Sequence, residues 1–298
     1  MRRTLTTLLA LATSSATLVL AGGATATGEE RSARGEPRPL RYVAMGDSYS
    51  AASGVLPLDP TAPPQCLRSS RNYPHVLAGR LARRQRPVRL TDVTCGAAET
   101  GDYFEPQYDG VPPQLAALTR RTRLVTMTIG GNDNGVFVGA IAKCGTAGLA
   151  ALGRGNPCEE QYGRSFVRTI RHKTRPALVK ALRAVHRHAP RARVAILGYP
   201  WIVPREVGCF ARLPVAEGDV PYLRNIQRVL NRAVERAARR TGSTYVDLNR
   251  VSHGHDACQD LGVRWVEPVL TSTNPVVVHP NALGERKMAR RALQVLGR

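Results

Sequence analysis

Ser48 is the residue of this sequence whose type and position most suggest a catalytic role. It follows the apolar run 42–45 through Gly46 and Asp47. A short apolar run that ends in glycine predicts a buried strand of a parallel sheet, and such sheets hold their ligands where the strands end. Gly-Asp-Ser is also a common turn sequence. Ser48 is therefore a candidate nucleophile whose assignment depends on its partners.

A serine nucleophile needs a general base and fixed donors for the oxyanion that forms during attack. His279 is the candidate base, because it lies in a His-Pro-Asn sequence just before a helical pattern. Asn132 follows a second apolar run and offers a side-chain amide. Gly96 follows a third strand-like run and offers a backbone N–H. Together these groups predict acyl transfer from an ester to Ser48 and then to water.

These four blocks, in this order, resemble the SGNH or GDSL-type hydrolases from about residue 41 to the end of the chain. The resemblance implies that Ser48 is the nucleophile, His279 the base, and Gly96 and Asn132 the oxyanion hole. It also implies an α/β class, with the three-layer α/β/α, flavodoxin-like fold and its central parallel sheet. The sequence is most similar to secreted actinomycete esterases, lipases and phospholipases of this family. The resemblance implies no cofactor and no metal.

One position departs from the pattern of the family. Most members carry an acid three residues before the histidine, and this chain has Val276 there. Since valine has no side-chain acceptor, the resemblance implies a Ser-His dyad. In it, the backbone carbonyl of Val276 or an immediate neighbour holds the second ring nitrogen of His279. A carbonyl fixes the tautomer but brings no negative charge. Asp247 and Asp256 are the alternative orienters.

The chain has an even number of cysteines, which in an exported protein predicts three disulfides. Six thiols allow 15 pairings, and the sequence does not choose among them. The family resemblance implies three bridges: Cys66 to Cys95, Cys144 to Cys158, and Cys209 to Cys258. No Cys-x-x-Cys pair exists, so a structural zinc site is not predicted. Neither the histidine pairs near 186 and 253 nor the segment 132–135 has the spacing of a metal site.

The remaining sequence alternates strand-like runs with helical patterns, which predicts a parallel sheet covered on both faces. We expect strands at 42–45, 88–93, 124–129, 194–198 and 244–248 and helices at 72–84, 113–118, 222–240 and 281–296. Residues 137–187 should be mostly helical, interrupted by a glycine-rich loop that holds Cys144 and Cys158. Residues 249–278 are long and irregular, which is uncommon in a compact domain unless they serve a site.

The N-terminus has the features of an export signal. A short basic start, an apolar stretch and the sequence Ala-Thr-Ala predict a signal peptide at 1–26. Residues 27–39 are predicted to be a flexible segment, and 40–298 a single hydrolase domain. No later stretch reaches membrane-spanning length. We therefore expect a secreted, extracellular protein, which the family resemblance implies is a monomer.

The net charge of +21, from 43 Lys and Arg against 22 acids, is unusual. A basic surface attracts phospholipid head groups, teichoic acids or nucleic acid. The arginines are spread over several predicted helices, without one compact tract. No nucleic-acid motif is present, so specific nucleic-acid binding is not predicted. We expect the charge to promote encounter with an anionic lipid interface.

The sequence thus predicts a secreted serine ester hydrolase, a lipase or esterase that includes phospholipids among its expected substrates. One alternative is a carbohydrate O-acetyl esterase, since this family also removes acetyl groups. Trp201 and Trp265 are the only tryptophans, which gives little support to a sugar-stacking platform. The other alternative is a non-catalytic, basic binding protein on the same fold.

Overall fold

The computed structural model describes residues 38–84 and 87–297, and these form one compact unit. The predicted signal peptide and most of the predicted flexible segment lie outside the described residues. The strands are β1 (Leu40–Ala44), β2 (Val88–Asp92), β3 (Leu124–Met127), β4 (Arg193–Leu197) and β5 (Thr244–Val246). The α-helices are α1 (Ser48–Ala51), α2 (Tyr73–Ala82), α3 (Val138–Ala150), α4 (Pro157–Tyr162), α5 (Ser165–Thr169), α6 (Arg175–His188), α7 (Asp219–Thr241) and α8 (Ala282–Leu296). A π-helical turn, Ile170–Thr174, joins α5 to α6, and short 3₁₀ turns cover Pro64–Cys66, Thr100–Tyr103, Gln114–Ala117 and Asp133–Gly135.

The five strands form one parallel sheet in the order β2-β1-β3-β4-β5. This is the flavodoxin-like order, in which the connections that follow β1 and β3 run to opposite faces of the sheet. A crevice opens at such a reversal point, outside the carboxyl ends of β1 and β3. Ser48 follows β1, and Asn132 follows β3. The topology confirms the predicted fold class and brings these two blocks to one edge.

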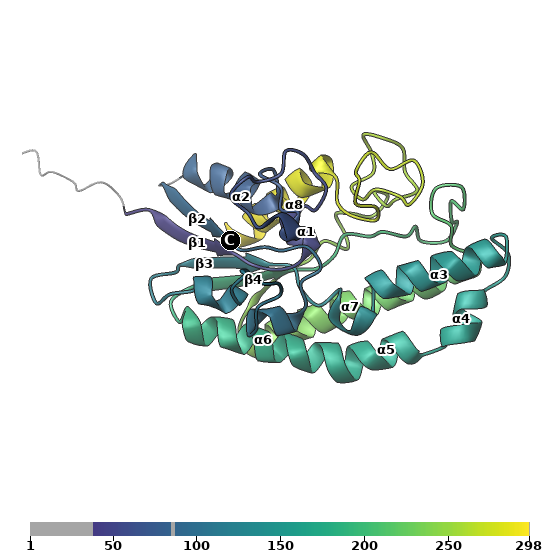
Figure 1. Ribbon diagram of the computed structural model, residues 1–298, viewed down its shortest axis with the longest axis horizontal. Coiled ribbons are helices and arrows are strands. Elements are labelled where there is room, and N and C mark those ends of the chain that lie inside the picture. Colours follow the sequence, from purple (N-terminus) through teal and green to yellow (C-terminus); the bar gives the residue numbers. More distant parts are fainter. Residues whose placement is uncertain (1–37, 85–86, 298) are drawn as a thin grey trace, which may run out of the picture. The chain divides into compact units, whose positions relative to one another are not determined.

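Helices cover both faces of the sheet, because alternate residues of each buried strand point to opposite sides. On one side, Met45, Met127 and Ile196 pack in a cluster with residues of α6 and α7. On the other, Tyr42 and Leu197 pack with residues of α2 and α8. Figure 1 shows α6 and α7 along one face and α2 and α8 along the other. The result is the predicted three-layer α/β/α arrangement.

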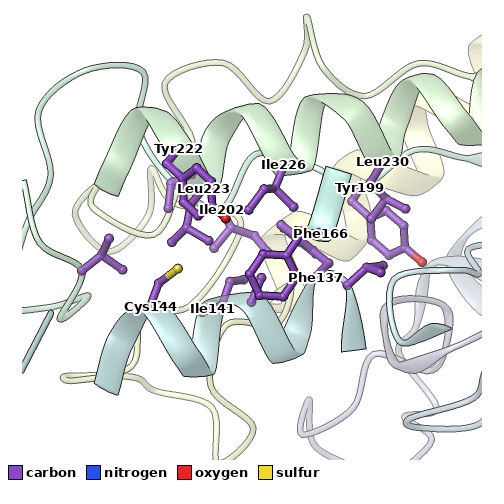
Figure 2. Close-up of a cluster of buried hydrophobic side chains, with 14 of the residues drawn as sticks. Phe137, Ile141, Cys144, Phe166, Tyr199, Ile202, Tyr222, Leu223, Ile226 and Leu230 are labelled. Atoms are coloured by element: carbon purple, nitrogen blue, oxygen red, sulfur yellow. The ribbon is translucent and has the colours of Figure 1, made fainter. Parts of the chain in front are cut away.

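A further apolar cluster lies between α3 and the first half of α7. Figure 2 shows Phe137 and Ile141 from the α3 side directed toward Leu223 and Ile226 of α7. Cys144 lies in α3 and Cys158 in α4, so the expectation that both occupy the intervening loop is wrong. The apolar spacing of α3 explains the difference, since Cys144 is buried on the same face as Ile141.

Residues 249–278 contain no helix or strand, as the sequence predicts; this whole segment is described. The disulfide Cys209–Cys258 and a buried ion pair between Arg264 and Glu267 hold it in place. The other two bridges join Cys66 to Cys95 and Cys144 to Cys158. Across residues 38–84 and 87–297, no helix combines the length and apolarity that crossing a membrane requires.

Candidate active site

The turn that carries Ser48 needs glycine at position 46. Gly46 has a φ of 117°, which L side chains rarely adopt, and a Cβ there would lie 2.2 Å from the carbonyl oxygen of Thr128. This close approach lets the end of β1 pack against the end of β3. Asp47 then caps α1 by accepting the Tyr49 N–H at 3.0 Å, and Ser48 is the first residue of that helix. The glycine and the cap thus fix the position of the serine.

Ser48 and His279 form a hydrogen-bonded pair although 231 residues separate them. Ser48 Oγ lies 2.7 Å from Nε2 of His279, and Nδ1 of His279 lies 2.7 Å from the carbonyl oxygen of Val277. A carbonyl only accepts, so Nδ1 carries the proton and Nε2 is left to accept from the serine hydroxyl. Burial lowers the pKa of His279 below its ordinary 6.5, and the bond to Val277 opposes this shift. The imidazole is therefore neutral at neutral pH.

The carbonyl beside His279 belongs to Val277 rather than to Val276 itself, and Val277 is one of the immediate neighbours that the prediction allowed. Val278 adopts a left-handed φ of 61°, which turns the chain so that the carbonyl two residues before the histidine faces its ring. Neither alternative acid takes this place. Asp247 accepts from Asn249, and Asp256 accepts from the Cys258 N–H and from Gln259.

The segment that carries His279 is held by contacts that the motifs alone did not indicate. Tyr49, next to Ser48, donates a hydrogen bond from its hydroxyl to the Val278 carbonyl at 2.6 Å. Backbone bonds join the Glu267 N–H to the His279 carbonyl and the Val278 N–H to the Glu267 carbonyl. The Glu267 carboxylate pairs with Arg264 at 2.6 Å. Burial opposes ionisation of Glu267, but hydrogen bonds from Arg264, Thr273 and Asn281 outweigh it and lower its pKa.

Asp47 lies at the centre of a buried network beneath the serine. Its carboxylate accepts from the Thr128 hydroxyl at 2.6 Å and from the Tyr199 hydroxyl. The Tyr199 oxygen in turn accepts the Gly131 N–H at 2.8 Å. Burial raises the pKa of Asp47, although these bonds oppose the shift. This network ties the loops after β1, β3 and β4 together.

The predicted oxyanion donors differ in whether they retain an N–H that makes no hydrogen bond within the protein. The Asn132 amide donates to the Ala98 carbonyl at 3.0 Å, which uses one of its two N–H bonds. The Gly96 N–H donates to the Cys66 carbonyl at 2.8 Å, so it could serve an oxyanion only by giving up that bond. The next residue, Ala97, has a left-handed φ of 63°. Among the described residues, the Ala97 N–H has no acceptor.

Two links hold the loop after β2 in place, one to the segment before α2 and one to the loop after β3. The disulfide Cys66–Cys95 lies directly before Gly96. Asp133, next to Asn132, accepts from both the backbone N–H and the hydroxyl of Thr100, at 2.9 and 2.7 Å. The bonds between Thr100 and Asp133 hold the Gly96 and Asn132 segments beside each other before any substrate binds.

An apolar pocket of about 330 Å³ opens next to the Ser48–His279 pair. One wall is α3, and the other comes from the loops after β4 and before α8. Its lining is almost entirely apolar: Tyr49, Val138, Ile141, Ala142, Gly145, Thr146, Leu149, Ile202, Pro214, Val269, Val277, Val278 and His279. Its volume lies at the lower end of the range of small-molecule sites, about 300–1,000 Å³. The arrangement suits an acyl chain whose carbonyl carbon lies at Ser48.

The histidines considered as metal ligands have other contacts. His186 shares a hydrogen bond with Ser243, and His255 stacks on Trp265 with 4.7 Å between ring centroids. Within the described part of the chain, no three His, Cys, Asp or Glu side chains gather as metal ligands would.

The sequence belongs to a family that agrees with this geometry. Residues 44–287 match the GDSL-like Lipase/Acylhydrolase family, so the chain is a member of that family. It is 58% identical over 260 residues to Lipase 2 of Streptomyces coelicolor, a match that covers 87% of this chain and 86% of that protein. It is also 30% identical to a lipase of Streptomyces rimosus over 83% of this chain and 82% of that protein.

The fold is similar to that of two solved structures. The crystal structure of phospholipase A1 from Streptomyces albidoflavus NA297 matches with a TM-score of 0.70 and 27% identity, over 87% of this chain and 99% of that chain. An extracellular lipase from Streptomyces rimosus matches with a TM-score of 0.68 and 27% identity, over 87% of this chain and 98% of that chain. The chain is thus a carboxylic ester hydrolase, a lipase or esterase of the GDSL family. The binding-protein alternative finds no support.

Proposed function

We propose that this protein is a secreted lipase that hydrolyses long-chain carboxylic esters, phospholipids included, with Ser48 and His279 as a catalytic dyad. The observation that carries the proposal is the 2.7 Å contact between Ser48 Oγ and His279 Nε2 at the mouth of the apolar pocket. Similarity to Streptomyces lipases and to a phospholipase A1 supports the class of substrate.

In the proposed reaction, Nε2 of His279 takes the proton of Ser48 while Oγ attacks the ester carbonyl carbon. The imidazolium then gives this proton to the leaving alcohol, and the acyl group remains on Ser48. Water enters and loses a proton to Nε2 while its oxygen attacks the acyl carbon. The bond from this carbon to Oγ then breaks, Nε2 returns the proton to Oγ, and the acid leaves with Ser48 restored. The Val277 carbonyl holds Nδ1–H throughout, so the same nitrogen acts as base and acid.

The oxyanion is proposed to bind the free amide N–H of Asn132, the Ser48 N–H and a backbone N–H of the loop after β2. Gly96 is the predicted donor of that loop. The unbonded N–H of Ala97 is a second candidate, supported by its left-handed backbone. A non-glycine residue in this conformation costs on the order of 1 kcal/mol, and such strain often occurs at functional sites.

The acyl chain is proposed to lie along α3 in the apolar pocket, and exposed apolar side chains near its rim would meet a lipid aggregate. Leu149 and Val277 line the pocket and are 55% and 39% exposed. The positive net charge would draw the molecule toward anionic lipid surfaces by long-range attraction. Comparing hydrolysis in vesicles with and without an anionic phospholipid tests this part of the proposal.

A series of p-nitrophenyl esters from acetyl to palmitoyl, followed by phosphatidylcholine, tests the proposed function. We expect activity to rise toward longer chains and to vanish in the variant Ser48→Ala, whose melting temperature should match that of the parent. A preference for acetyl would favour the carbohydrate O-acetyl esterase instead. Ser48-independent turnover would overturn the dyad.

Secretion and a monomeric state complete the proposal. Three disulfides suit an oxidising compartment, and one structural neighbour is an extracellular lipase. Mass spectrometry of the protein from culture medium should find a mature N-terminus near residue 27. Light scattering should give the mass of one chain. Retention in the cell with residues 1–26 intact would contradict the secretion proposal.

A further inference from the structure

Arginines of α6 and α7 line a long groove on the face of the sheet opposite α2 and α8. The groove has a volume of about 950 Å³, and a smaller hollow of about 100 Å³ shares Arg175 and Arg236 with it. We call the two together the arginine groove. Its basic residues are Arg171, Arg175, Lys180, Arg183, Arg187, Arg232, Arg236, Arg239 and Arg240. Figure 1 shows the two helices running beside each other along this face. In the sequence the arginines are spread over several predicted helices, and the packing of α6 against α7 brings these nine basic residues together.

The groove has very little negative charge of its own. No lining residue is acidic, and the sequence holds no Asp or Glu between residues 161 and 205. Among the described residues, only Arg239 of this set has an ion-pair partner, the Glu235 carboxylate at 2.6 Å. Mutual repulsion of so many unpaired cations disfavours the folded state unless an anion is bound. The groove therefore has the electrostatics of an anion site.

The spacing of these arginines suits a linear polymer. Arg183 and Arg187 are four residues apart on α6, as are Arg232, Arg236 and Arg240 on α7. Four residues of helix rise about 6 Å, so each row presents a cation at regular intervals. The guanidinium group binds phosphate through two parallel hydrogen bonds, and arginine outnumbers lysine eight to one among these nine residues.

The other residues that line the groove indicate which class of polyanion it fits. Single-stranded nucleic acids bind where aromatic side chains stack on the bases, and no aromatic residue lines the groove. Proteins that lie on a bilayer insert large apolar side chains, and in the described part of the chain no such residue of α6 or α7 is exposed. The groove therefore fits a flexible phosphodiester chain that has neither bases nor a lipid surface.

We propose that the arginine groove binds a linear polyol-phosphate polymer, such as poly(glycerol phosphate), at a site separate from the ester-hydrolysing pocket. The groove lies between α6 and α7, whereas the pocket lies between α3 and the loops around His279. None of the groove residues contributes to the proposed catalytic machinery. The site would hold the enzyme on an anionic polymer while the pocket remains open to substrate.

The test compares two variants with equal net charge. The groove variant carries Arg183→Gln, Arg187→Gln, Arg236→Gln and Arg240→Gln. The control variant carries Arg83→Gln, Arg84→Gln, Arg286→Gln and Arg290→Gln, all exposed positions on or next to α2 and α8. Affinity for poly(glycerol phosphate) is measured by isothermal titration at several salt concentrations. The same titrations are run with oligo(dT) and with anionic phospholipid vesicles, and p-nitrophenyl butyrate hydrolysis reports the ester site.

We expect the parent and the control variant to bind poly(glycerol phosphate) with steep salt dependence. The groove variant should bind at least ~10-fold more weakly, and its slope of log affinity against log salt should be smaller by about 3, since four contacts are lost. Butyrate hydrolysis should be the same in all three proteins. Equal weakening in both variants would overturn the proposal in favour of diffuse net charge. So would a groove variant that loses affinity only for oligo(dT) or only for vesicles.

Discussion

At the scale of single residues, the proposed dyad of Ser48 and His279 differs from a triad in the charge beside the histidine. The Val277 carbonyl fixes the tautomer of His279 but does not stabilise the imidazolium as a carboxylate would. Stabilisation of charge in the transition state must then depend more on the oxyanion donors. Both consequences can be measured.

The pH dependence of kcat/KM should show that no carboxylate lies beside His279. His279 must be neutral to accept a proton, and burial lowers its pKa below 6.5, so activity should be high at neutral pH and fall as the pH drops through the lowered pKa. We expect the midpoint of the acid limb below pH 6.5. The variants Asp247→Asn and Asp256→Asn should have the same midpoint. A midpoint above 6.5 would contradict this prediction, because it would require a nearby negative charge.

Substituting Asn132 tests the oxyanion assignment. Asn132→Ala should lower kcat about 10²- to 10³-fold, because one preorganised donor is lost where negative charge develops. The melting temperature should change little, since the Asn132 side chain makes a single hydrogen bond, to the Ala98 carbonyl. Single-turnover kinetics with p-nitrophenyl butyrate separate this loss from weaker binding. A variant with near-normal turnover would remove Asn132 from the oxyanion hole.

At the scale of elements, α3 sets the size of the acyl pocket. Gly145 lines the pocket, and a Cβ added there meets no atom within 4 Å. Gly145→Leu should fill the pocket, lower activity on palmitoyl esters at least ~10-fold relative to acetyl esters, and stabilise the helix slightly. Gly139→Leu is the matched control, because its added side chain also meets open space on α3 but does not line the pocket. Equal chain-length profiles for both variants would place the acyl chain elsewhere.

The irregular segment 249–278 is held by a buried ion pair, and this pair has a measurable effect on stability. Arg264 and Glu267 have side chains that are 3% and 0% exposed. Glu267→Gln leaves the Arg264 charge buried without its partner, which should lower the free energy of unfolding by about 3 kcal/mol or more in urea titration. Glu235→Gln, which breaks the surface pair with Arg239, should change it by less than about 1 kcal/mol. Similar small effects for both variants would mean that the buried pair does not stabilise the folded protein.

At the scale of the whole molecule, the disulfides join distant parts of the chain. Cys209 and Cys258 are 49 residues apart, and a bridge across such a loop restricts the unfolded chain by about 4 kcal/mol in the entropic estimate. The double variant Cys209→Ser, Cys258→Ser should melt several degrees lower, as scanning calorimetry would show. The double variant Cys144→Ser, Cys158→Ser removes a bridge that closes a shorter loop of 14 residues, so its melting temperature should fall less. The reverse order would contradict the loop-length argument.

Much of the site could be predicted because its chemistry depends on residue types in fixed local settings. Gly46 is required by a positive φ and by the approach of β3, and Ser48 follows it directly. Apolar runs predict the strands, and the alternation of these runs with helical patterns predicts a parallel sheet. The residues that follow the strands then give the order of the site segments along the chain. These local patterns predict which residues belong to the site and which edge of the sheet holds it.

The tertiary structure decided what depends on the path of irregular backbone. A left-handed turn at Val278 selected the Val277 carbonyl, and the bond from Gly96 to Cys66 left the neighbouring N–H of Ala97 without an acceptor. Helix packing gathered arginines from α6 and α7 into one groove, although they are spread along the sequence. The physical reason is the same in each case. Periodicity sets which face of an element is buried, whereas loop dihedral angles and helix neighbours are set only by long-range packing.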